Sequence, residues 1–263
     1  MLKQVLSSIV VLLLAGAGCT TLKPALTFSD TQTWDKSLFE YSNSKSEYFS
    51  EEEMSQFYLP PFPPADSEIG RAELQKLKED MKLRTPERLV KMRYGGKSSF
   101  GIIDLEELKE HDPILIYVVY LMKSSTLPIY RFKKKYDRVR PQFIDPEIIP
   151  AMELPAHPSY PSGSSAHNHM MAYGLALIAP EYEDVIIEKA RQIARNREVA
   201  GIHYKSDTEA GKLLARQVLQ ALKPKKEFQE KLKLAKAEYR KRKKVFEAKW
   251  QLRQKSEITF LDE

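Results

Sequence analysis

One stretch of eleven residues, from Arg197 to Asp207, contains three side-chain types that can together perform nucleophilic chemistry. Arginine offers a planar fork of donors that fits phosphate oxygens, histidine is a nucleophile near neutral pH, and aspartate can fix the histidine tautomer. Arg197, His203 and Asp207 supply these three groups. The same stretch also fits a plain surface loop and helix cap, because Ser206 and Glu209 have capping-box spacing. Both interpretations predict a helix that begins just after His203. They differ in whether the residues before this helix form a nucleophilic site.

Two upstream stretches favour the chemical interpretation. Residues Lys133 to Pro141 concentrate cations and end in Arg140-Pro141, although a charge run standing alone usually marks a solvated face. Further on, residues 157–167 form a proline-punctuated turn that contains Ser162, Gly163 and Ser164 and leads into a helical pattern. Serine and glycine are ordinary capping residues, but a helix N-terminus also presents unpaired backbone donors and the positive end of the dipole. This turn therefore predicts an anion site.

Taken together, the three stretches resemble the signature of the type 2 phosphatidic acid phosphatase superfamily, which includes the vanadium haloperoxidases. Its first motif is Lys, six residues, Arg-Pro, and its third places arginine six residues before histidine and aspartate four after. Lys133 with Arg140-Pro141 fits the first motif, and Arg197, His203 and Asp207 fit the third. The resemblance extends to the bacterial class A nonspecific acid phosphatases, across roughly residues 58–236, in the segments Leu59-Pro-Pro-Phe-Pro-Pro, Ser159-Tyr-Pro-Ser-Gly and Gly201-Ile-His-Tyr-Lys-Ser-Asp.

The resemblance implies an all-α fold, a single helical-bundle domain, and a phosphomonoesterase that uses no metal or other cofactor. His203 would attack phosphorus to form a phosphohistidine intermediate, and Asp207 would orient His203. A concentrated positive cradle can stabilise phosphoryl transfer where magnesium is absent. The phosphate oxygens would be held at the following positions: Lys133, Arg140, Ser162, Gly163, Ser164 and Arg197.

One position departs from the family pattern. The second motif continues Pro-Ser-Gly with a histidine that protonates the leaving group, whereas this chain has Ser164. Because general acid catalysis typically contributes about 10²- to 10⁴-fold, a true vacancy would leave a slow enzyme. His167, one helical turn further on, is our substitute for the acid; a packed or surface histidine is the other interpretation. His169 points elsewhere on a helix, and His111 has no motif around it.

Three functions remain open on these residues. The first is an acid phosphatase that hydrolyses small phosphomonoesters. The second is a phosphate- or anion-binding protein that keeps the cradle but has lost turnover through Ser164. The third is a vanadate-dependent haloperoxidase on the same fold, which is disfavoured because the resemblance outside the motifs is to the phosphatases.

The N-terminus has the pattern of an export signal. Lys3 precedes an apolar run from Val5 to Ala17, which is shorter than the roughly 18 residues of a membrane span. The segment ending in Cys19 resembles a bacterial lipoprotein processing site, although Gly16 stands where the pattern prefers an aliphatic residue. Cys19 is the only cysteine, so lipidation would explain a thiol that no intrachain disulfide can use. We expect an exported, periplasmic protein attached to the outer membrane; ordinary signal cleavage beside an incidental thiol is the alternative.

Composition excludes several other classes. The chain has 263 residues, 42% of them apolar, and a net charge of +6, which suits anionic substrates or surfaces without requiring nucleic acid. It has no zinc-type Cys/His pattern, no phosphate-binding GxxxxGK[ST] loop and no dinucleotide fingerprint. Apolar spacing predicts helices, and Ile114 to Met122 is assigned to a core helix although its length also allows a buried strand.

The chain organisation predicted from these patterns has four parts. Residues 1–18 are the signal, 19–56 a tether and irregular lead-in, and 57–222 the phosphatase domain. Residues 223–263 form a basic C-terminal helix and tail, whose apolar residues have a spacing that lets the helix lie partly on the body. A solvated helical tail is the simpler interpretation of this segment, and contact between its basic face and anionic lipid headgroups is the functional one.

Overall fold

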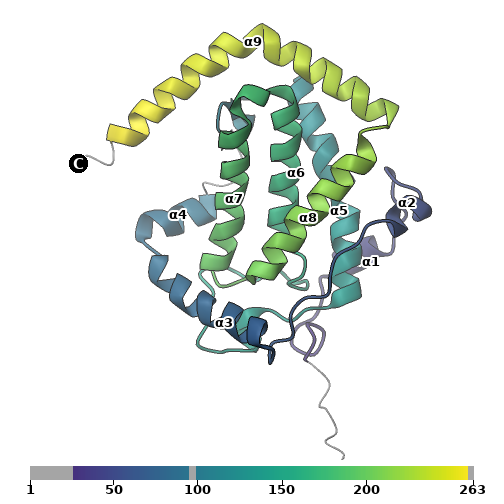
Figure 1. Ribbon diagram of the computed structural model, residues 1–263, viewed down its shortest axis with the longest axis vertical. Helices are drawn as coiled ribbons and strands as arrows, with labels where there is room; N and C mark the ends of the chain where they lie inside the picture. The colour runs from purple at the N-terminus through teal and green to yellow at the C-terminus, as the bar shows by residue number, and fades with distance from the viewer. Residues whose placement is uncertain (1–25, 95–98, 260–263) are drawn as a thin grey trace, which may run out of the picture.

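The chain folds almost entirely into helices. The computed structural model describes residues 26–94 and 99–259, and Figure 1 shows its arrangement. Among these residues the paired strands are β1 (Ser99–Phe100) and β2 (Ile103–Asp104), a two-stranded antiparallel hairpin. The predicted all-α helical bundle is therefore confirmed, with this hairpin as a small addition. The helices, in chain order, are α1 (Lys36–Ser42), α2 (Glu51–Ser55), α3 (Glu68–Asp80), η1 (Met81–Leu83), α4 (Pro86–Tyr94), η2 (Leu105–Glu107), α5 (Pro113–Tyr136), η3 (Pro141–Phe143), α6 (Gly163–Ile178), η4 (Pro180–Tyr182), α7 (Glu183–Val199), α8 (Lys205–Leu222) and α9 (Lys226–Thr259).

The bundle is centred on α6, which packs between α5, α7 and α8 (Figure 1). Eleven of its sixteen residues are buried, which is the burial expected of a helix that is apolar on nearly every side. Its N-terminal end lies against α8 so closely that a side chain at Gly211 would approach the Ser162 carbonyl oxygen to 2.5 Å. Glycine at this position therefore allows the two helices that carry the predicted site to meet.

Helix α5 confirms the choice of a core helix over a strand. The side chain of Asp112 caps its first turn by accepting a hydrogen bond from the Ile114 backbone N–H, and Pro113 occupies the first helical position. The helix ends where Asp137 adopts a left-handed conformation, with φ of 42°. By length and composition α5 could cross a membrane, but over half of its apolar window is buried against the rest of the bundle. Most of its apolar residues therefore form core, whereas Ile116 and Val119 are exposed.

The N-terminal lead-in differs from the expected tether. From residue 26 onward it packs on the body, and Phe28 and Phe49 are buried. Thr27 forms an isolated antiparallel bridge with Arg138, and the Phe28 backbone N–H donates to the Asp137 carbonyl at 2.7 Å. This stretch also contains two short helices, α1 and α2, where the sequence predicted irregular structure. The predicted signal and Cys19 lie outside the described residues.

Helix α9 is a continuous 34-residue helix that arches over one end of the bundle (Figure 1). Phe228, Tyr239 and Phe246 are buried against the body, as the apolar spacing predicts. The division of the chain into the four predicted parts stays a prediction.

Candidate active site

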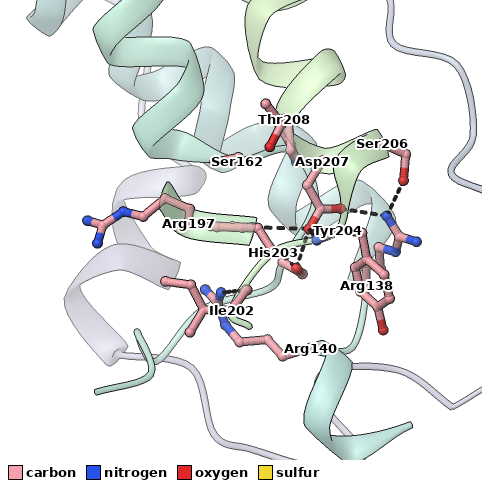
Figure 2. Close-up of polar contacts among 12 residues, drawn as sticks. Arg138, Arg140, Ser162, Arg197, Ile202, His203, Tyr204, Ser206, Asp207 and Thr208 are labelled. Carbon is pink, nitrogen blue, oxygen red and sulfur yellow. Dashed lines mark hydrogen bonds and ion pairs between the residues drawn. The ribbon is translucent and has the colours of Figure 1, made fainter. Parts of the chain in front are cut away.

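The motif residues converge at one end of the bundle. They come from the end of α5 and the loop after it, from the N-terminus of α6, and from the turn between α7 and α8. Figure 2 shows Arg138, Arg140, His203 and Asp207 close together at this end. Segments more than sixty residues apart in the sequence thus form one site, as in the hydrogen bond from Arg140 Nη1 to the Ile202 carbonyl at 2.7 Å.

The turn that carries His203 depends on Gly201. Helix α7 ends at Val199, and Gly201 then adopts a φ of +73°, a region that glycine enters without steric cost. A side chain at this position would also approach Ile148 Cγ2 to 3.1 Å and Arg84 Nη2 to 3.0 Å. The Gly201 backbone N–H donates to the Glu198 carbonyl at 2.7 Å and closes the end of the helix. The chain therefore reverses here and brings His203 back over the site.

His203 and Asp207 form a buried pair. His203 Nδ1 lies 3.0 Å from Asp207 Oδ2, and the two side chains are at most 4% exposed. Asp207 Oδ2 also accepts a hydrogen bond from the Tyr204 backbone N–H at 3.0 Å. The helix begins at Lys205, so one carboxylate both starts α8 and holds the imidazole. The predicted capping box of Ser206 with Glu209 is wrong, because the carboxylate that bonds back to the helix start is Asp207.

Arg138 holds the other side of Asp207 and was missed in the sequence. Its Nη1 donates to Asp207 Oδ1 at 2.6 Å, and its Nη2 lies 3.2 Å from Glu73 Oε2 on α3. The guanidinium carbon lies 3.6 Å from the centre of the Tyr204 ring. Figure 2 shows Arg138 and His203 on either side of Asp207. The available signal was the position of Arg138, two residues before Arg140 within the cation run.

Ser159 is a second missed residue. Its hydroxyl donates to Asp207 Oδ2 and lies 3.3 Å from His203 Nδ1. Its side chain is fully buried between the loop before α6 and the start of α8. The sequence signal that could have indicated Ser159 was the Ser-Tyr-Pro-Ser-Gly segment. This segment supported the family resemblance, but no role was predicted for its first serine. Asp207 therefore receives hydrogen bonds from three separate segments.

These contacts set the charge states of the pair. Burial alone would raise the pKa of Asp207, but the Arg138 guanidinium and the His203 imidazole outweigh it and hold this pKa well below its usual range. Burial lowers the pKa of His203 to about 3, and the positive charge of Arg140 and Lys133 acts in the same direction against the Asp207 contact. His203 is therefore neutral at mildly acid pH, with its proton assigned to Nδ1 because the carboxylate accepts there.

The second ring nitrogen of His203 is available for attack. Nε2 makes no hydrogen bond within the described residues, and it is not among the fully enclosed polar atoms that lack a partner. A neutral imidazole with Nδ1–H held by a carboxylate presents its Nε2 lone pair outward. This arrangement can perform nucleophilic chemistry at Nε2.

Lys133 and Arg140, two predicted phosphate ligands, are fully buried beside the loop before α6. Lys133 Nζ donates to the carbonyls of Pro158 and Pro161 at 2.6 and 2.7 Å, and to the Ser159 carbonyl at 3.3 Å. Burial and the nearby Arg140 lower the pKa of Lys133, while the negative charge of Asp207 acts in the opposite direction. The lysine therefore shapes the loop as well as supplying charge.

Arg140 links the same loop to the turn that precedes α8. Besides its bond to the Ile202 carbonyl, its Nη2 donates to the His157 carbonyl at 2.9 Å. Its Nε is buried and has no partner among the described residues. Burial and the positive charges of Lys133 and Arg140 lower the pKa of His157 to about 2, so this histidine adds no positive charge.

The N-terminus of α6 is held in place by its own cap and by α8. Ser162 Oγ accepts a hydrogen bond from the Ser165 backbone N–H at 3.3 Å, and the Ser162 N–H donates to the Asp207 carbonyl at 2.9 Å. A side chain at Gly163 would meet only ordinary contacts, at 3.7 Å to Ile129 and 3.9 Å to Lys133. Packing thus does not require glycine at position 163, and its N–H remains part of the helix end that can bind an anion.

Ser164 and Arg197 contact each other rather than the His203 pair. Arg197 Nε donates to Ser164 Oγ at 3.0 Å, and Arg197 Nη1 lies 2.7 Å from Met152 Sδ. In Figure 2 the Arg197 guanidinium points away from Asp207. The serine that replaces the expected histidine is therefore engaged by an arginine side chain.

His167, the predicted substitute acid, lies against α5. Its Nε2 is 3.2 Å from Thr126 Oγ1, and burial together with Lys133 lowers its pKa to about 4. His169 is directed into the core, where its Nδ1 lies 2.8 Å from the Ser165 carbonyl oxygen. His111 is exposed before the start of α5, at the end of this helix remote from Lys133. The structure therefore brings His167 near the site but not into hydrogen-bond contact with His203 or Ser164.

A cavity of about 430 Å³ lies elsewhere, on the face of α7 that is shared with α4. None of the predicted site residues lines it. Among residues 26–94 and 99–259, no group of three His, Cys, Asp or Glu side chains is arranged to hold a metal ion. The predicted site residues thus lie at one end of the bundle, away from this cavity.

Comparison with known proteins places the sequence near the phosphatases. A non-specific acid phosphatase from Providencia stuartii is 34% identical over 116 residues, which make up 43% of this chain and 47% of the relative. The match thus spans about half of that protein. No family model matches the chain.

Solved structures with similar arrangements are more distant. A bacterial vanadium-dependent iodoperoxidase aligns with 17% identity over 64% of this chain and 54% of its own, with a TM-score of 0.44. A transmembrane PAP2-type phosphatidylglycerolphosphate phosphatase from Bacillus subtilis aligns with 18% identity over 72% of this chain and 93% of its own, with a TM-score of 0.44. The sequence relative by itself confirms the resemblance: this chain is similar to the non-specific acid phosphatases.

Proposed function

We propose that this protein is an acid phosphatase that hydrolyses small phosphomonoesters through a phosphohistidine at His203. One observation carries the proposal: a buried, neutral His203 with a free Nε2 is held by Asp207 at 3.0 Å, and the positive charges of Arg138, Arg140 and Lys133 act on this pair. Such a combination of nucleophile, orienting carboxylate and cations fits phosphoryl transfer, which depends mainly on positioning and on stabilising charge. The name of the Providencia relative supports the same activity.

In the first step, Nε2 of His203 forms a bond to phosphorus while the bond to the ester oxygen breaks on the opposite side. The negative charge on the phosphoryl oxygens is stabilised by the positive site and by the N–H groups at the start of α6. The imidazole becomes positively charged as the bond forms, and Asp207 stabilises it. Arg138 keeps Asp207 ionised and in place, so it acts as a positioning residue.

In the second step, water attacks phosphorus and the bond to Nε2 breaks, which releases inorganic phosphate and restores neutral His203. The attacking water gives its proton to His167, which lost one to the leaving group in the first step. The alkoxide released in the first step needs a proton, which His167 supplies in this proposal. Because the pKa of His167 is lowered to about 4, it carries this proton only toward acid pH. His167 is one turn beyond Ser164, and it must leave the hydrogen bond with Thr126 to reach the leaving group. The position of that bond makes proton donation the weakest element of the site.

The proposal is tested with the purified full chain on a chromogenic phosphomonoester from about pH 4 to about pH 8. We expect hydrolysis that survives a chelator and is inhibited by vanadate competitively with phosphate, because vanadate adopts the five-coordinate geometry of the transition state. The His203→Ala variant should lose this activity. Activity that disappears in chelator and returns with zinc or magnesium would contradict the metal-free mechanism.

An anion-binding protein without turnover is the second candidate. Two observations favour it. Lys133 already donates to three backbone carbonyls, and Ser164, which Arg197 contacts, stands where the family pattern has the proton-donating histidine. Such a protein would bind phosphate without releasing product and would show little preference for vanadate. A haloperoxidase would instead oxidise halide when vanadate and peroxide are supplied.

We also propose that the chain is exported and anchored through lipidated Cys19 in the outer membrane. The support is the apolar N-terminal run followed by the sole cysteine. In a membrane fraction washed with high salt, which screens charge contacts, the wild-type protein should remain bound and the Cys19→Ser variant should be released. A wild-type protein that is already soluble after this wash would contradict the anchor.

A further inference from the structure

The positive charge of the chain is concentrated in one helix. Between Lys226 and Thr259 the sequence has twelve Lys or Arg against five Asp or Glu, a net of +7. The whole chain carries +6, so all residues outside α9 together carry a net of −1. The net positive charge of the chain therefore comes from α9.

Part of this charge is used in holding α9 on the body. Arg242 pairs with Asp112 before α5, Lys243 Nζ lies 2.6 Å from Glu181 Oε1, and Lys249 Nζ lies 2.7 Å from Glu107 Oε2. These pairs flank the buried aromatic residues of the helix. These three cations of α9 therefore have a structural role, because they pair with carboxylates of the bundle.

A second set of cations has no such partner. Lys233, Lys236, Arg240 and Lys244 have no carboxylate oxygen within 4.0 Å among the described residues. Spacings of three, four and four residues place them along one stripe of the helix surface. Three of the four are exposed, and Lys236 is half-buried. This stripe is free to meet an external anionic partner.

An apolar stripe runs parallel to the cations, roughly a third of a turn around the helix from them. Leu234, Val245 and Leu252 are 60%, 52% and 67% exposed, and spacings of eleven and seven residues put them on one side of the helix. We call the four unpaired cations and these three aliphatic residues the outer face of α9. A face that combines exposed aliphatic side chains with unpaired lysine and arginine is typical of helices that lie in a membrane interface.

We propose that the outer face of α9 docks on a membrane surface rich in anionic phospholipid. Cations attract the charged headgroups, and the three aliphatic side chains enter the boundary between headgroups and acyl chains. A nucleic acid would use the cations but would gain little from aliphatic side chains, since its unpaired bases favour aromatic partners. The apolar stripe therefore favours lipid.

Docking through α9 would leave the candidate active site facing the solution. The body contacts of α9 are at Asp112 before α5 and Glu181 after α6, whereas the site lies at the other ends of these helices (Figure 1). The sixteen residues of α6 span roughly 24 Å at 1.5 Å per residue. If the proposed phosphatase activity holds, a docked molecule would act on soluble esters rather than on lipids of the membrane that it touches.

A lipid on Cys19 would itself bind vesicles and mask the contribution of α9. It would do so from the site end of the molecule, because Cys19 lies seven residues before Leu26 and Thr27 pairs with Arg138 there. All variants therefore carry Cys19→Ser. Purified full chains are sedimented with phosphatidylcholine vesicles that contain or lack phosphatidylglycerol, at low and high salt. We expect binding to the phosphatidylglycerol vesicles at low salt and its loss at high salt.

Two matched variants locate the binding surface. Changing Lys233, Lys236, Arg240 and Lys244 to Gln should weaken vesicle binding by about a hundredfold or more, since each cation near the surface contributes severalfold. A control removes the same charge from exposed lysines outside α9, by the changes Lys36→Gln, Lys45→Gln, Lys82→Gln and Lys109→Gln. It should change binding by much less. Equal losses in both variants would overturn the proposal.

A third variant distinguishes lipid from nucleic acid. Changing Leu234, Val245 and Leu252 to Gln should also weaken vesicle binding, while unchanged thermal unfolding shows that the fold is intact. The lipid proposal would be overturned if the wild-type protein did not sediment with the phosphatidylglycerol vesicles. It would also be overturned if the protein bound RNA but not vesicles. None of these readouts uses enzyme activity, so the proposed phosphatase function can fail independently.

Discussion

The nucleophile side and the leaving-group side of the candidate site are organised very differently. On the nucleophile side, Asp207 receives bonds from Arg138, Ser159, His203 and the Tyr204 backbone, and every one of these groups is buried. On the leaving-group side, Ser164 is engaged by Arg197, and His167 contacts Thr126 on a neighbouring helix. The first side is fixed before any ligand binds, whereas the second must rearrange to deliver a proton.

If the proposed phosphatase activity holds, this difference indicates which step limits its rate. A preorganised nucleophile needs little reorganisation to reach the transition state. A proton donor that first breaks another hydrogen bond adds a step that matters only when the leaving group is a strong base. Esters with good leaving groups should therefore react through the nucleophile side alone.

The largest expected effect is the loss of the nucleophile. His203→Ala should lower kcat by roughly 10³-fold or more on all esters, because no covalent intermediate can form. His111→Ala is the matched control, since His111 is exposed and lies at the other end of α5. Initial rates on one phenolic and one alkyl phosphate test the prediction. Full activity of the His203 variant would place the nucleophile elsewhere.

The next effect concerns the groups behind His203. Asp207→Asn should lower kcat by about 10²- to 10⁴-fold, because an amide can favour the wrong tautomer and cannot stabilise the imidazolium. Arg138→Gln should lower kcat by a smaller factor than Asp207→Asn. It should also move the acid limb of the pH–rate profile to higher pH, because an Asp207 without its Arg138 partner holds the protonated form of His203 more strongly.

The pH profile separates positioning from general structural damage. A variant that had merely lost packing would show a lower rate with an unchanged acid limb. Glu73→Gln offers a check from the far side of the same network, since Glu73 contacts Arg138 but not His203. Because it removes a negative charge that partly neutralises Arg138, it should shift the acid limb in the opposite direction from Arg138→Gln, to lower pH, and by a smaller amount.

A smaller and selective effect is expected on the leaving-group side. His167→Ala should slow an alkyl phosphate by about tenfold or more and leave a good phenolate ester nearly unchanged, because only the alkoxide needs a proton badly. Equal losses on both esters would indicate a packing role. Ser164→His should accelerate the alkyl ester, with Ser164→Ala as the control for the lost Arg197 contact.

The smallest effect concerns stability in acid. Burial lowers the pKa of His169 to about 4, whereas an unfolded histidine titrates near 6.5. The unfolded chain therefore binds the extra proton first, and the free energy of unfolding falls as pH drops from about 6.5 toward about 4. The slope should approach about 1.4 kcal/mol per pH unit for this residue. Denaturant unfolding of wild type and His169→Asn across this window measures the difference, and an unchanged slope in the variant would contradict it.

The sequence predicted what depends on local pattern and on the motifs. The helical patterns on either side decided in favour of the core helix α5, apolar spacing indicated α8, and motif spacing selected Arg140, His203 and Asp207. Contacts from remote segments could not be predicted. Glu73 accepts a hydrogen bond from the Ser206 backbone N–H across 133 residues, and no local spacing indicates that pairing. The burial of Phe28 is likewise determined by the surface that it packs against, and the residues next to it in the sequence do not indicate it.

The three carbonyls around Lys133 have a further consequence for the loop before α6. Carbonyl oxygens that converge on a positive charge also form the coordination shell of a monovalent ion, so the ammonium is in effect an ion attached to the chain. In a Lys133→Ala variant the oxygens would repel one another, and the loop would open. Added ammonium or methylammonium should then partly restore activity, in proportion to its concentration, while the larger tetramethylammonium should not.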